Sequence, residues 1–359
     1  MKIIHIVWQM SIGGIETMLM DIASVQAETE EVHIVAINDN QNPDMMARLD
    51  PRIKFYCCGR KLKSRSPLPF VKLNAYLLHH RPDIIHTHFL DIYKYIYYRG
   101  IKVKTIHNTR NNPREFDYYD CCYAISRSVR DEWAAIGREL IPVVNGINCN
   151  AIRQRVQIRE KKPFTADEHV HIVQVSRLFI KQKGQDIAIK ALELLQEKMG
   201  GEGPRITLHF IGEGPDEEFL RKMAEEAGLK DQVVFEGLKS REWVYDNLYR
   251  FDLFVQPSRF EGFGLTVAEA CAAKIPVLVS DNDGPNEILD GGRLGMTFKS
   301  GDAEALARKL HEFISEGYSP GTIEEAYRHT LANYDVRHTA LTYIEEYRKV
   351  INKRKRNAR

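Results

Sequence analysis

Short apolar runs alternate with amphipathic stretches along most of the chain, and this alternation limits the fold more than any other feature. It is typical of an α/β protein in which helices connect parallel strands. In the first half we expect helices at Ile15–Gln26, Val71–His79 and Ser128–Ile136. The strands expected around them are Lys2–Val7, Val32–Ile37, Ile53–Cys57, Asp83–Thr87, Val103–His107, Cys121–Ile125 and Ile141–Val144.

A second series of the same kind follows a polar segment, Arg153–His169, which we interpret as a linker. A chain of 359 residues fits two doubly wound domains facing each other across a cleft. We expect them at residues 1–158 and 164–337, with a C-terminal helix in 338–359 that contains the periodic stretch His338–Ile351 and ends in a basic tail. The second series comprises strands at His171–Val175, Thr207–Ile211, Val233–Glu236, Leu253–Gln256 and Pro276–Ser280, and helices at Gly184–Lys198, Pro215–Ala227, Trp243–Leu248, Leu265–Ala273 and Ala303–Ser315.

Composition excludes several classes of function. The net charge of +2 gives no reason to expect nucleic acid as a partner. No apolar run approaches the roughly 18–20 residues of a membrane span, and the first ten residues are interpreted as a strand rather than a signal peptide. The six cysteines include two vicinal pairs and no CxxC spacing, which favours a reducing cytoplasm over a disulfide framework or a zinc site.

Residues 257–287 carry the most specific functional signal. Glu261 opens the loop Gly262–Gly264, and the helix expected after it carries a second carboxylate, Glu269. A glycine turn at a helix start leaves backbone N–H groups unpaired, which suits an anionic ligand. Two glutamates beside an anion site fit hydroxyl groups better than phosphates, and a nucleotide sugar offers both. The alternative is a helix-entry acid followed by an ordinary surface glutamate.

Cations follow the first strand of the second expected domain, and glycines follow the first strand of the first domain. Arg177 and Lys183 lie where doubly wound folds bind ligands, and together they can balance a diphosphate, a task that otherwise falls to a metal. Lys181 competes for this role, and a solvated basic loop is the alternative. In the first domain, Gly13 and Gly14 precede a helix and let the backbone approach a phosphate, unless they form a plain tight turn.

Histidines at two strand ends are further candidates. His107 ends an expected strand and can touch a substrate hydroxyl or a developing charge, although a single histidine is more often structural. His86 and His88 alternate on one strand, but we see no third metal ligand nearby and interpret them as structural. Asp281 and Asp283 resemble a metal-binding DxD, but the following glycine and proline favour a turn.

Taken together, these residues resemble the retaining glycosyltransferases of family four, or group 1, which have the two-domain GT-B architecture. The Glu261 and Glu269 pair is similar to that family's E-x7-E motif, and the stretch SRLFIKQKG, residues 176–184, is similar to its donor site. Further similarities are the amino-terminal glycine loop, the turn NGIN that begins at Asn145, and the loop IGEGP that contains Gly214. Asn148 departs from the aspartate of that family's turn.

The resemblance implies transfer of a sugar, with retention, from a nucleotide-sugar donor to a hydroxyl of a saccharide or lipid-linked saccharide, in bacterial surface polysaccharide or glycolipid biosynthesis. It implies no metal and no other cofactor. It also implies that the final helix crosses back to the first domain. Catalytic positions are implied for His107 and Glu261, and donor-binding positions for Gly13, Gly14, Asn145, Arg177, Lys183, Gly214, Gly262, Phe263, Gly264, Leu265, Thr266 and Glu269.

Two other functions remain open, a sugar-nucleotide epimerase of GT-B fold and a non-catalytic partner protein. A separate clue concerns the acceptor. Residues 51–82 contain eight basic and no acidic side chains, which suits an anionic membrane or a lipid pyrophosphate. A solvated basic loop is the alternative, and Pro67 and Pro69 favour a loop. We therefore predict a cytoplasmic protein with peripheral membrane contact through residues 52–81.

Overall fold

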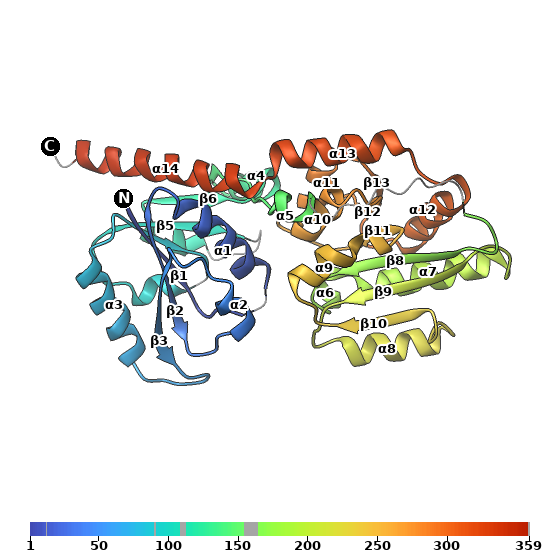
Figure 1. The fold of residues 1–359 in the computed structure, drawn as a ribbon, viewed down its shortest axis with the longest axis horizontal. Coiled ribbons are helices and arrows are strands. Elements are labelled where there is room, and N and C mark those ends of the chain that lie inside the picture. Colours follow the sequence, from blue (N-terminus) through green and yellow to red (C-terminus); the bar gives the residue numbers. More distant parts are fainter. Residues whose placement is uncertain (12, 90, 108–112, 154–163, 358–359) are drawn as a thin grey trace. The chain divides into compact units, whose positions relative to one another are not determined.

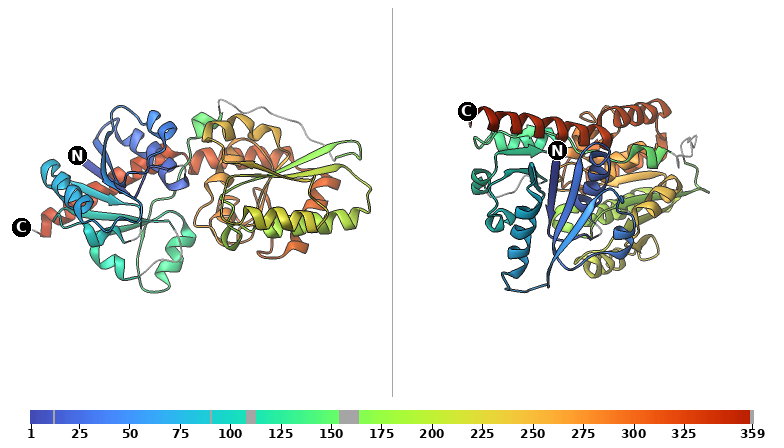
Figure 2. Two further views of the ribbon diagram at one scale, coloured as in Figure 1. Left: turned by 90° about the horizontal axis from the view of Figure 1, so that it is seen from below. Right: turned by 60° about the vertical axis from the view of Figure 1, so that its left-hand side comes forward.

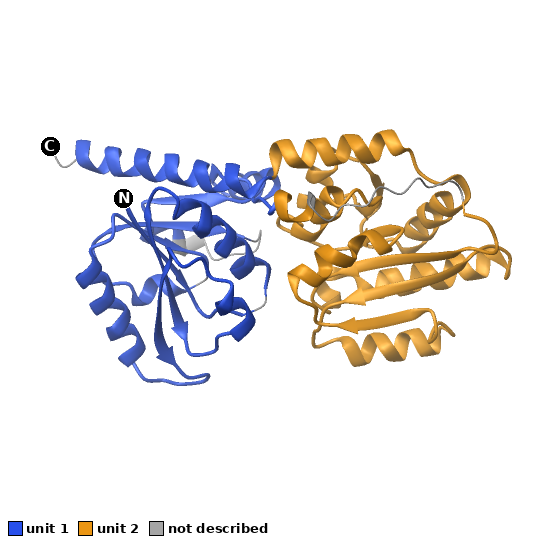
Figure 3. Cartoon of the chain, in the orientation of Figure 1, with its two compact units in different colours: residues 1–148, 335–359 blue, residues 149–334 orange. Residues whose placement is uncertain are grey.

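The computed structural model describes residues 1–11, 13–89, 91–107, 113–153 and 164–357 (Figure 1). The chain forms two compact units, unit 1 with residues 1–148 and 335–359, and unit 2 with residues 149–334 (Figure 3). The first division lies ahead of the expected boundary at residue 158, because helix α5 (Cys149–Arg153) packs against a helix of unit 2. Most of the expected linker, residues 154–163, lies outside the described residues.

Unit 1 contains a parallel sheet in which seven strands belong to the described residues, in the order β3-β2-β1-β4-β5-β6-β7. The chain order reverses between β1 and β4, which are paired in register over Ile3–Ile6 and Ile84–Thr87. Such a reversal is where doubly wound sheets bind ligands. The strands are β1 (Lys2–Val7), β2 (Glu31–Asn38), β3 (Lys54–Arg60), β4 (Ile84–Thr87), β5 (Ile101–Ile106), β6 (Cys121–Ala124) and β7 (Ile141–Pro142).

Helices cover both faces of this sheet. Helix α3 (Leu68–His80) packs Leu73 and Leu77 against one face, in a core that includes Ile4 and Ile6. The other face carries α1 (Gly14–Gln26) and the C-terminal helix α14 (Val336–Asn357), which contact each other. The C-terminal helix, dark red in Figure 2, runs beside the strands of unit 1. The shorter elements are α2 (Pro43–Ala47), η1 (Ile92–Tyr95), η2 (Pro113–Tyr118) and α4 (Arg127–Ala134).

Unit 2 repeats the doubly wound order. Its described residues form six parallel strands in the order β10-β9-β8-β11-β12-β13, so the chain order reverses between β8 and β11. Two parallel sheets of this kind confirm the predicted α/β class with two Rossmann-like domains. The strands are β8 (His169–Val175), β9 (Arg205–Ile211), β10 (Val233–Gly237), β11 (Leu253–Gln256), β12 (Val277–Ser280) and β13 (Met296–Phe298).

Two groups of helices enclose the sheet of unit 2. Helices α7 (Gln185–Met199), α8 (Glu217–Glu226) and α12 (Ala303–Glu316) contribute side chains to one apolar core with β8 and β9. Helix α10 (Leu265–Ala272) contacts α5 and α13 (Pro320–Asn333) instead. The remaining elements are α6 (Ile180–Lys183), α9 (Arg241–Asn247), η3 (Leu248–Arg250) and α11 (Asp283–Ile288).

Several expectations about individual segments were wrong. Helix α3 begins at Leu68, where a loop was expected, because a proline is tolerated in the first turn of a helix and Pro69 occupies that turn. The expected turn at Asp283 is the start of α11. No helix among the described residues is long and apolar enough to cross a membrane.

Candidate functional site

The loops that follow β8 and β9 lie in contact at the carboxyl edge of the unit 2 sheet. The backbone N–H of Ser176 donates to the carbonyl of Ile211 over 3.0 Å. A Cβ at Gly212 would lie 2.1 Å from the carbonyl oxygen of Ser176, and one at Gly214 would lie 2.0 Å from that of Leu178. Gly212 also has a φ of +138°. Only glycine therefore lets these two turns approach each other so closely.

Two fully buried glutamines fix the loop after β8. The side-chain amide of Gln185 donates to the carbonyl of Arg177 over 2.9 Å, and that of Gln174 donates to the carbonyl of Lys183 over 2.9 Å. Gly184 closes this loop with a φ of +67°, and a Cβ there would lie 1.9 Å from the carbonyl oxygen of Pro257. The loop after β8 is thus pressed against the loop after β11, at the point where the strand order reverses.

This contact brings Lys183 and Glu261 together. The ammonium group of Lys183 forms an ion pair with Oε2 of Glu261, and the two side chains are 17% and 15% exposed. The pairing distinguishes Lys183 from Lys181, which is exposed. Arg177 is also exposed, and none of the described carboxylates forms an ion pair with it. Arg177 is therefore a cation without a carboxylate partner among the described residues, whereas the charge of Lys183 is balanced.

A second ion pair ties the same two loops together, and its residues were not predicted. The guanidinium of Arg259 donates to both carboxylate oxygens of Asp186 over 2.8 and 2.7 Å, and to the carbonyl of Ile180 over 2.7 Å. The backbone N–H of Arg259 donates to Gln182 over 2.8 Å. A bidentate pair of this kind fixes orientation as well as distance. Arg259 holds the α6 segment that carries Lys183.

The glycine loop before α10 has the backbone geometry of an anion site. Gly264 is the residue before the helix and has a φ of +99°, and as a glycine it has no side chain to cap the helix. The first intrahelical bonds are donated by Val267 and Ala268, so the amides of Leu265 and Thr266 precede them. The loop is buried at Gly262, Phe263 and Gly264.

Residues near α11 brace this glycine loop. The backbone N–H of Glu261 donates to the carboxylate of Asp283 over 3.2 Å, and Gly284 donates back to the carbonyl of Glu261 over 3.2 Å. A Cβ at Gly284 would lie 2.4 Å from the Cα of Phe263. The carboxylate of Asp281 accepts from the backbone of Ser300 over 2.9 Å. Both aspartates of the DxD-like sequence therefore serve local backbone contacts.

Glu269 is only 7% exposed and is held by helix α9 rather than by the Lys183 pair. Its Oε1 accepts a hydrogen bond from the hydroxyl of Tyr245 over 2.9 Å and lies 3.5 Å from Nε of Arg241. The guanidinium of Arg241 lies 5.1 Å from the ring centroid of Tyr245. Neither α9 residue was predicted, because more than twenty residues separate them from Glu269 in the sequence. Tyr245 and Arg241 together hold one carboxylate oxygen of Glu269, Oε1, in place.

In unit 1 the predicted glycines lie at the start of α1, next to an unpredicted carboxyl group. Gly13 has an extended backbone, and its carbonyl accepts from the N–H of Thr17 over 3.0 Å. A Cβ at Gly13 would lie 2.5 Å from Oε2 of Glu16, so the glycine leaves room for this side chain. Glu16 is 8% exposed, and burial raises its pKa to about 7. Gly14 is exposed at the first turn of the helix.

His107 follows β5 and is partly buried. Burial, with a smaller contribution from the nearby charge of Lys104, lowers the pKa of His107 to about 3. Its Nε2 atom is buried and has no hydrogen-bond partner among the described residues. Its imidazole is therefore neutral at neutral pH and can exchange hydrogen bonds with a hydroxyl group, but it carries no charge.

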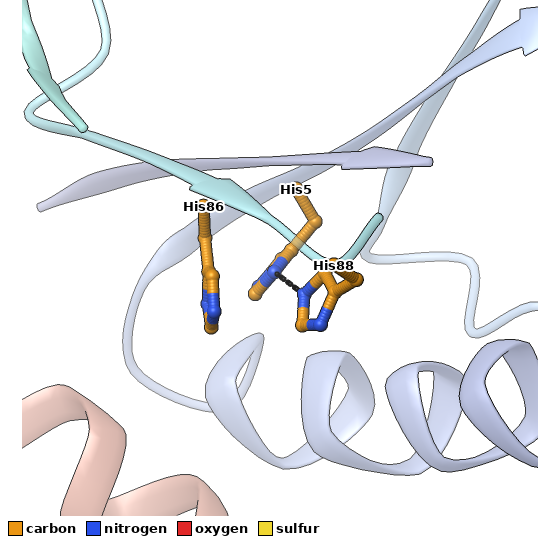
Figure 4. Close-up of side chains that lie close together, drawn as sticks. All are labelled: His5, His86 and His88. Atoms are coloured by element: carbon orange, nitrogen blue, oxygen red, sulfur yellow. Dashed lines mark hydrogen bonds between the residues drawn. The ribbon is translucent and has the colours of Figure 1, made fainter. Parts of the chain in front are cut away.

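Three histidines of unit 1 form a buried cluster at the reversal point of the sheet (Figure 4). The prediction that His86 and His88 have no third metal ligand nearby was wrong, because the pairing of β1 with β4 places His5 opposite His86. Nδ1 of His5 lies 3.1 Å from Nε2 of His88. The ligand atoms of the three residues lie within 4.8 Å of one another.

Most ring nitrogens of this histidine cluster already have partners in the protein, but Nδ1 of His88 is buried and has none among the described residues. Nε2 of His5 bonds to Gln26 over 2.8 Å, while His86 bonds to Tyr347 over 2.6 Å and to Thr105 over 2.7 Å. Burial lowers the pKa of His5 to about 4 and that of His86 well below its usual value. An ion here would have to break these bonds, so the cluster is a neutral network of the core.

Asn145 is 3% exposed and lies on a segment that packs against α14 within unit 1. The hydroxyl of Thr339 donates to the carbonyl of Val144 over 2.8 Å. A Cβ at Gly146 would lie 2.7 Å from Cα of Val336, so glycine is required for this contact. The Oδ1 of Asn145 is buried and has no hydrogen-bond partner among the described residues.

The fold defines an α/β protein built from two Rossmann-like domains, and comparison with known families shows which class it belongs to. The model described as "Glycosyltransferase Family 4" matches residues 12–151, and that described as "Glycosyl transferases group 1" matches residues 155–330. The chain belongs to the group 1 glycosyltransferases. The predicted family is thereby confirmed.

Individual relatives match over part of their length. The EpsD protein of Bacillus subtilis strain 168 is 32% identical over 176 residues, which cover 47% of this chain and 44% of that protein. The GDP-mannose-dependent alpha-(1-6)-phosphatidylinositol monomannoside mannosyltransferase of Mycobacterium tuberculosis is 28% identical over 161 residues, which cover 43% of this chain and 40% of that enzyme. The chain thus spans less than half the length of these two curated relatives.

A solved structure is similar over nearly the whole chain. HepE of Anabaena in complex with UDP and glucose has a TM-score of 0.76 and 18% identity, over 96% of this chain and 99% of that chain. At this identity the similarity concerns the fold.

Proposed function

We propose that the protein is a retaining glycosyltransferase that moves a sugar from a nucleotide-sugar donor to a hydroxyl of a saccharide or lipid-linked saccharide. The pathway we propose is bacterial surface polysaccharide or glycolipid biosynthesis. The observation that carries the proposal is the Lys183–Glu261 pair at the reversal point of the unit 2 sheet, together with Arg177, which has no carboxylate partner among the described residues. The bacterial relatives support the pathway, since one is named for a GDP-mannose-dependent transfer to a phosphatidylinositol mannoside.

In this proposal, different residues of unit 2 bind different parts of the donor. Arg177 and Lys183 bind the diphosphate, and the first-turn amides of α10 complement its charge. The backbone at Gly214 borders the nucleotide. Glu269 accepts hydrogen bonds from the ribose, and Glu261 contacts the donor sugar. The donor-loop set is completed by Gly262, Phe263, Gly264, Leu265 and Thr266.

The residues of unit 1 take smaller roles. Gly13 and Gly14 present backbone amides to the donor, and Asn145 contributes a side chain whose buried oxygen has no partner within the part of the chain that the structure describes. His107 contacts the sugar as a neutral hydrogen-bonding group, because its pKa lies near 3. A charged imidazolium is not the proton donor at neutral pH.

In the proposed reaction, the charge that most needs stabilising develops on the leaving group. In the proposed same-face substitution, the acceptor oxygen bonds to the anomeric carbon, the bond from that carbon to the phosphate breaks, and the acceptor proton passes to a departing phosphate oxygen. Negative charge then grows on the diphosphate, where Arg177 and Lys183 stabilise it. We propose that these two cations neutralise that charge without a metal.

Nucleotide binding tests the donor site directly. Titration calorimetry with UDP and with GDP should show at least about tenfold weaker binding after Arg177→Ala or Lys183→Ala, since each removes a charged hydrogen-bond donor. Lys181→Ala is the matched control and should bind as the unaltered protein does. If neither substitution weakens binding of the nucleotide that the protein prefers, the donor-site assignment is wrong. Repeating the titration with EDTA tests independence from metal.

Substituting Glu261, the partner of Lys183, should strengthen nucleotide binding instead of weakening it. Glu261→Gln removes the charge that balances Lys183 while keeping a similar shape. Because the pair is partly exposed, we expect a gain of about 1 kcal/mol, or about fivefold tighter binding of the nucleoside diphosphate, together with loss of transfer. Binding that weakens instead would show that Glu261 does not compete for Lys183.

Product analysis separates this function from its alternatives. Proton NMR of a donor-sugar panel with acceptor should show a product of unchanged anomeric configuration. An epimerase would change the donor incubated alone and would release the free nucleotide without any acceptor. A non-catalytic partner would bind nucleotide and do neither. We also propose that the protein works in the cytoplasm, with peripheral membrane contact through its basic residues 52–81.

A further inference from the structure

Unit 1 contains a cavity of about 690 Å³ that none of the proposed donor residues lines. It lies between α3, the segment that follows β3 and the segment that follows η1. We call it the aromatic cavity, and its lining includes Trp8, Arg60, Arg65, Phe70, Tyr95 and Tyr97. A concave, mostly apolar site with a few charged groups is the usual form of a small-molecule binding site.

The apolar wall of the aromatic cavity is built in advance. Phe70 stacks on Tyr95 with ring centroids 3.8 Å apart and meets Trp8 edge-on at 6.5 Å. Asn74 fixes this wall, because its side-chain amide donates to the carbonyls of Phe70 and Tyr95 over 2.8 Å each. Its side-chain oxygen accepts from the backbone of Tyr97 over 2.8 Å. The two chain segments are therefore held at a fixed spacing.

Two arginines give one side of the cavity an uncompensated positive charge. The guanidinium of Arg60 lies 5.8 Å from the ring centroid of Trp8 and donates to Asn38 over 3.2 Å and to the carbonyl of Ser64 over 3.0 Å. Arg65 is exposed. Among the described residues, no carboxylate forms an ion pair with either arginine, and residues 51–82 contain no acid. Arginine suits phosphate because its donors can bind two oxygens at once.

The rim of the cavity is apolar and exposed to water. Val71 is 60% exposed, Leu78 62% and Tyr97 74%, and all three line the cavity. Leu68 is 55% exposed and shares the face of α3 that carries Val71 and Leu78. Leu62, on the preceding loop, is 79% exposed. A contiguous apolar rim beside basic side chains marks a surface that meets lipid.

We infer that the aromatic cavity binds the acceptor, a lipid-linked saccharide that carries a phosphate or pyrophosphate and a long hydrocarbon chain and that comes from an anionic membrane. The phosphate lies against Arg60 and Arg65, the first part of the chain lies on the ring wall, and the exposed rim rests on the lipid. Identifying the bound amphiphile as an acceptor rests on the proposed transferase function. The binding itself follows from the charge and shape of the cavity.

A soluble prenyl phosphate tests the binding without any transfer. Calorimetric titration with farnesyl phosphate should detect binding. The double substitution Arg60→Gln with Arg65→Gln should weaken it at least about tenfold, as should Phe70→Ala. Lys72→Gln changes a basic residue of the same segment that does not line the cavity, and it should leave the affinity unchanged. Absence of binding, or equal loss in the Lys72→Gln protein, would overturn the proposal.

Two further ligands show which part of the amphiphile is recognised. Farnesol lacks the phosphate and inorganic pyrophosphate lacks the chain, so each should bind at least about tenfold more weakly than farnesyl phosphate. If either binds equally well, the cavity is not a site for an amphiphilic anion. Sedimentation with phosphatidylglycerol vesicles tests whether the amphiphile comes from an anionic membrane. Val71→Ser with Leu78→Ser should reduce the bound fraction, and an unchanged fraction would refute the membrane source.

Measuring UDP and GDP binding on the same variants separates the two proposals. The cavity variants should bind nucleotide unchanged, since their residues lie outside the donor set. A protein that binds nucleotide but not farnesyl phosphate would leave the donor site standing and refute the cavity site. A protein that binds farnesyl phosphate but neither nucleotide nor a nucleotide sugar would refute the transferase function, and with it the identification of the amphiphile as an acceptor.

Discussion

The histidine cluster of unit 1 makes stability depend on pH in a way that can be assigned to single residues. His5 is fully buried, and its pKa falls to about 4 in the folded protein, against 6.5 for an exposed imidazole. The unfolded chain therefore binds a proton more readily than the folded one. The stabilising contribution of neutral His5 is complete above 6.5 and is lost as the pH falls from 6.5 towards 4. Between about pH 7.5 and about pH 5, the loss is about 2 kcal/mol.

Glu16 of the same unit has the opposite effect. Its pKa is raised from 4.5 to about 7, so the folded protein binds a proton more readily than the unfolded chain. Its contribution grows as the pH falls through 7, by about 2 kcal/mol between about pH 7.5 and about pH 5. Because these two effects oppose each other, the stability of the unaltered protein changes little through them, and substitutions are needed to separate them.

The experiment compares three proteins by urea unfolding at both pH values. His5→Gln should remove about 2 kcal/mol of acid destabilisation. The free energy of unfolding of this variant should therefore fall by less than that of the unaltered protein when the pH is lowered from the higher to the lower value. Glu16→Gln should shift the same difference by a similar amount in the opposite direction. Hydrogen exchange of amides in β1 and β4 assigns the change to unit 1. If all three proteins show the same pH dependence, the burial argument for these groups is refuted.

Two further substitutions test the packing. Gly184→Ala forces a Cβ to 1.9 Å from the carbonyl of Pro257 at a φ of +67°. It should cost more than about 3 kcal/mol in urea unfolding, whereas Gly228→Ala, at a φ of +70° in open space, should cost only about 1 kcal/mol. Tyr347→Phe leaves a buried nitrogen of His86 without its partner and should lower stability by about 2 kcal/mol, measured in the same way. Equal costs for the two glycine changes, or no effect at Tyr347, would contradict the packing described above.

The strands were predictable where their side chains are apolar without interruption. Strands β1 and β11 have the predicted bounds, because all but one or two of their residues are apolar. Strand β13, at Met296–Phe298, was missed because three residues give no periodic signal. Helix α13, at Pro320–Asn333, was missed since it buries only Ala326 and Thr330, so its apolar face is too narrow to recognise.

The candidate site was predictable as residues but not as contacts. Glycines and charges around Lys183 and Glu261 mark an anion site in the sequence, yet their sequence separation of 78 hides the ion pair. Arg259 and Asp186 give no local signal, because their pairing depends on how the loops after β8 and β11 meet. His5 joins His86 only through the register of β1 and β4. Strand register and loop contact are properties of the folded sheet.

The position of α14 has a consequence for the order in which the protein is completed during synthesis. The ring nitrogens of His86 are hydrogen bonded by Tyr347 and Thr105, and Tyr343 bonds to the same threonine. Both tyrosines belong to a segment that the ribosome makes after all of unit 2. Unit 1 therefore begins first and is finished last. Until residues 336–357 emerge, the imidazoles of unit 1 lack these partners and the face under α14 is open. Unit 2 can therefore fold while unit 1 is still incomplete and accessible to chaperones and proteases.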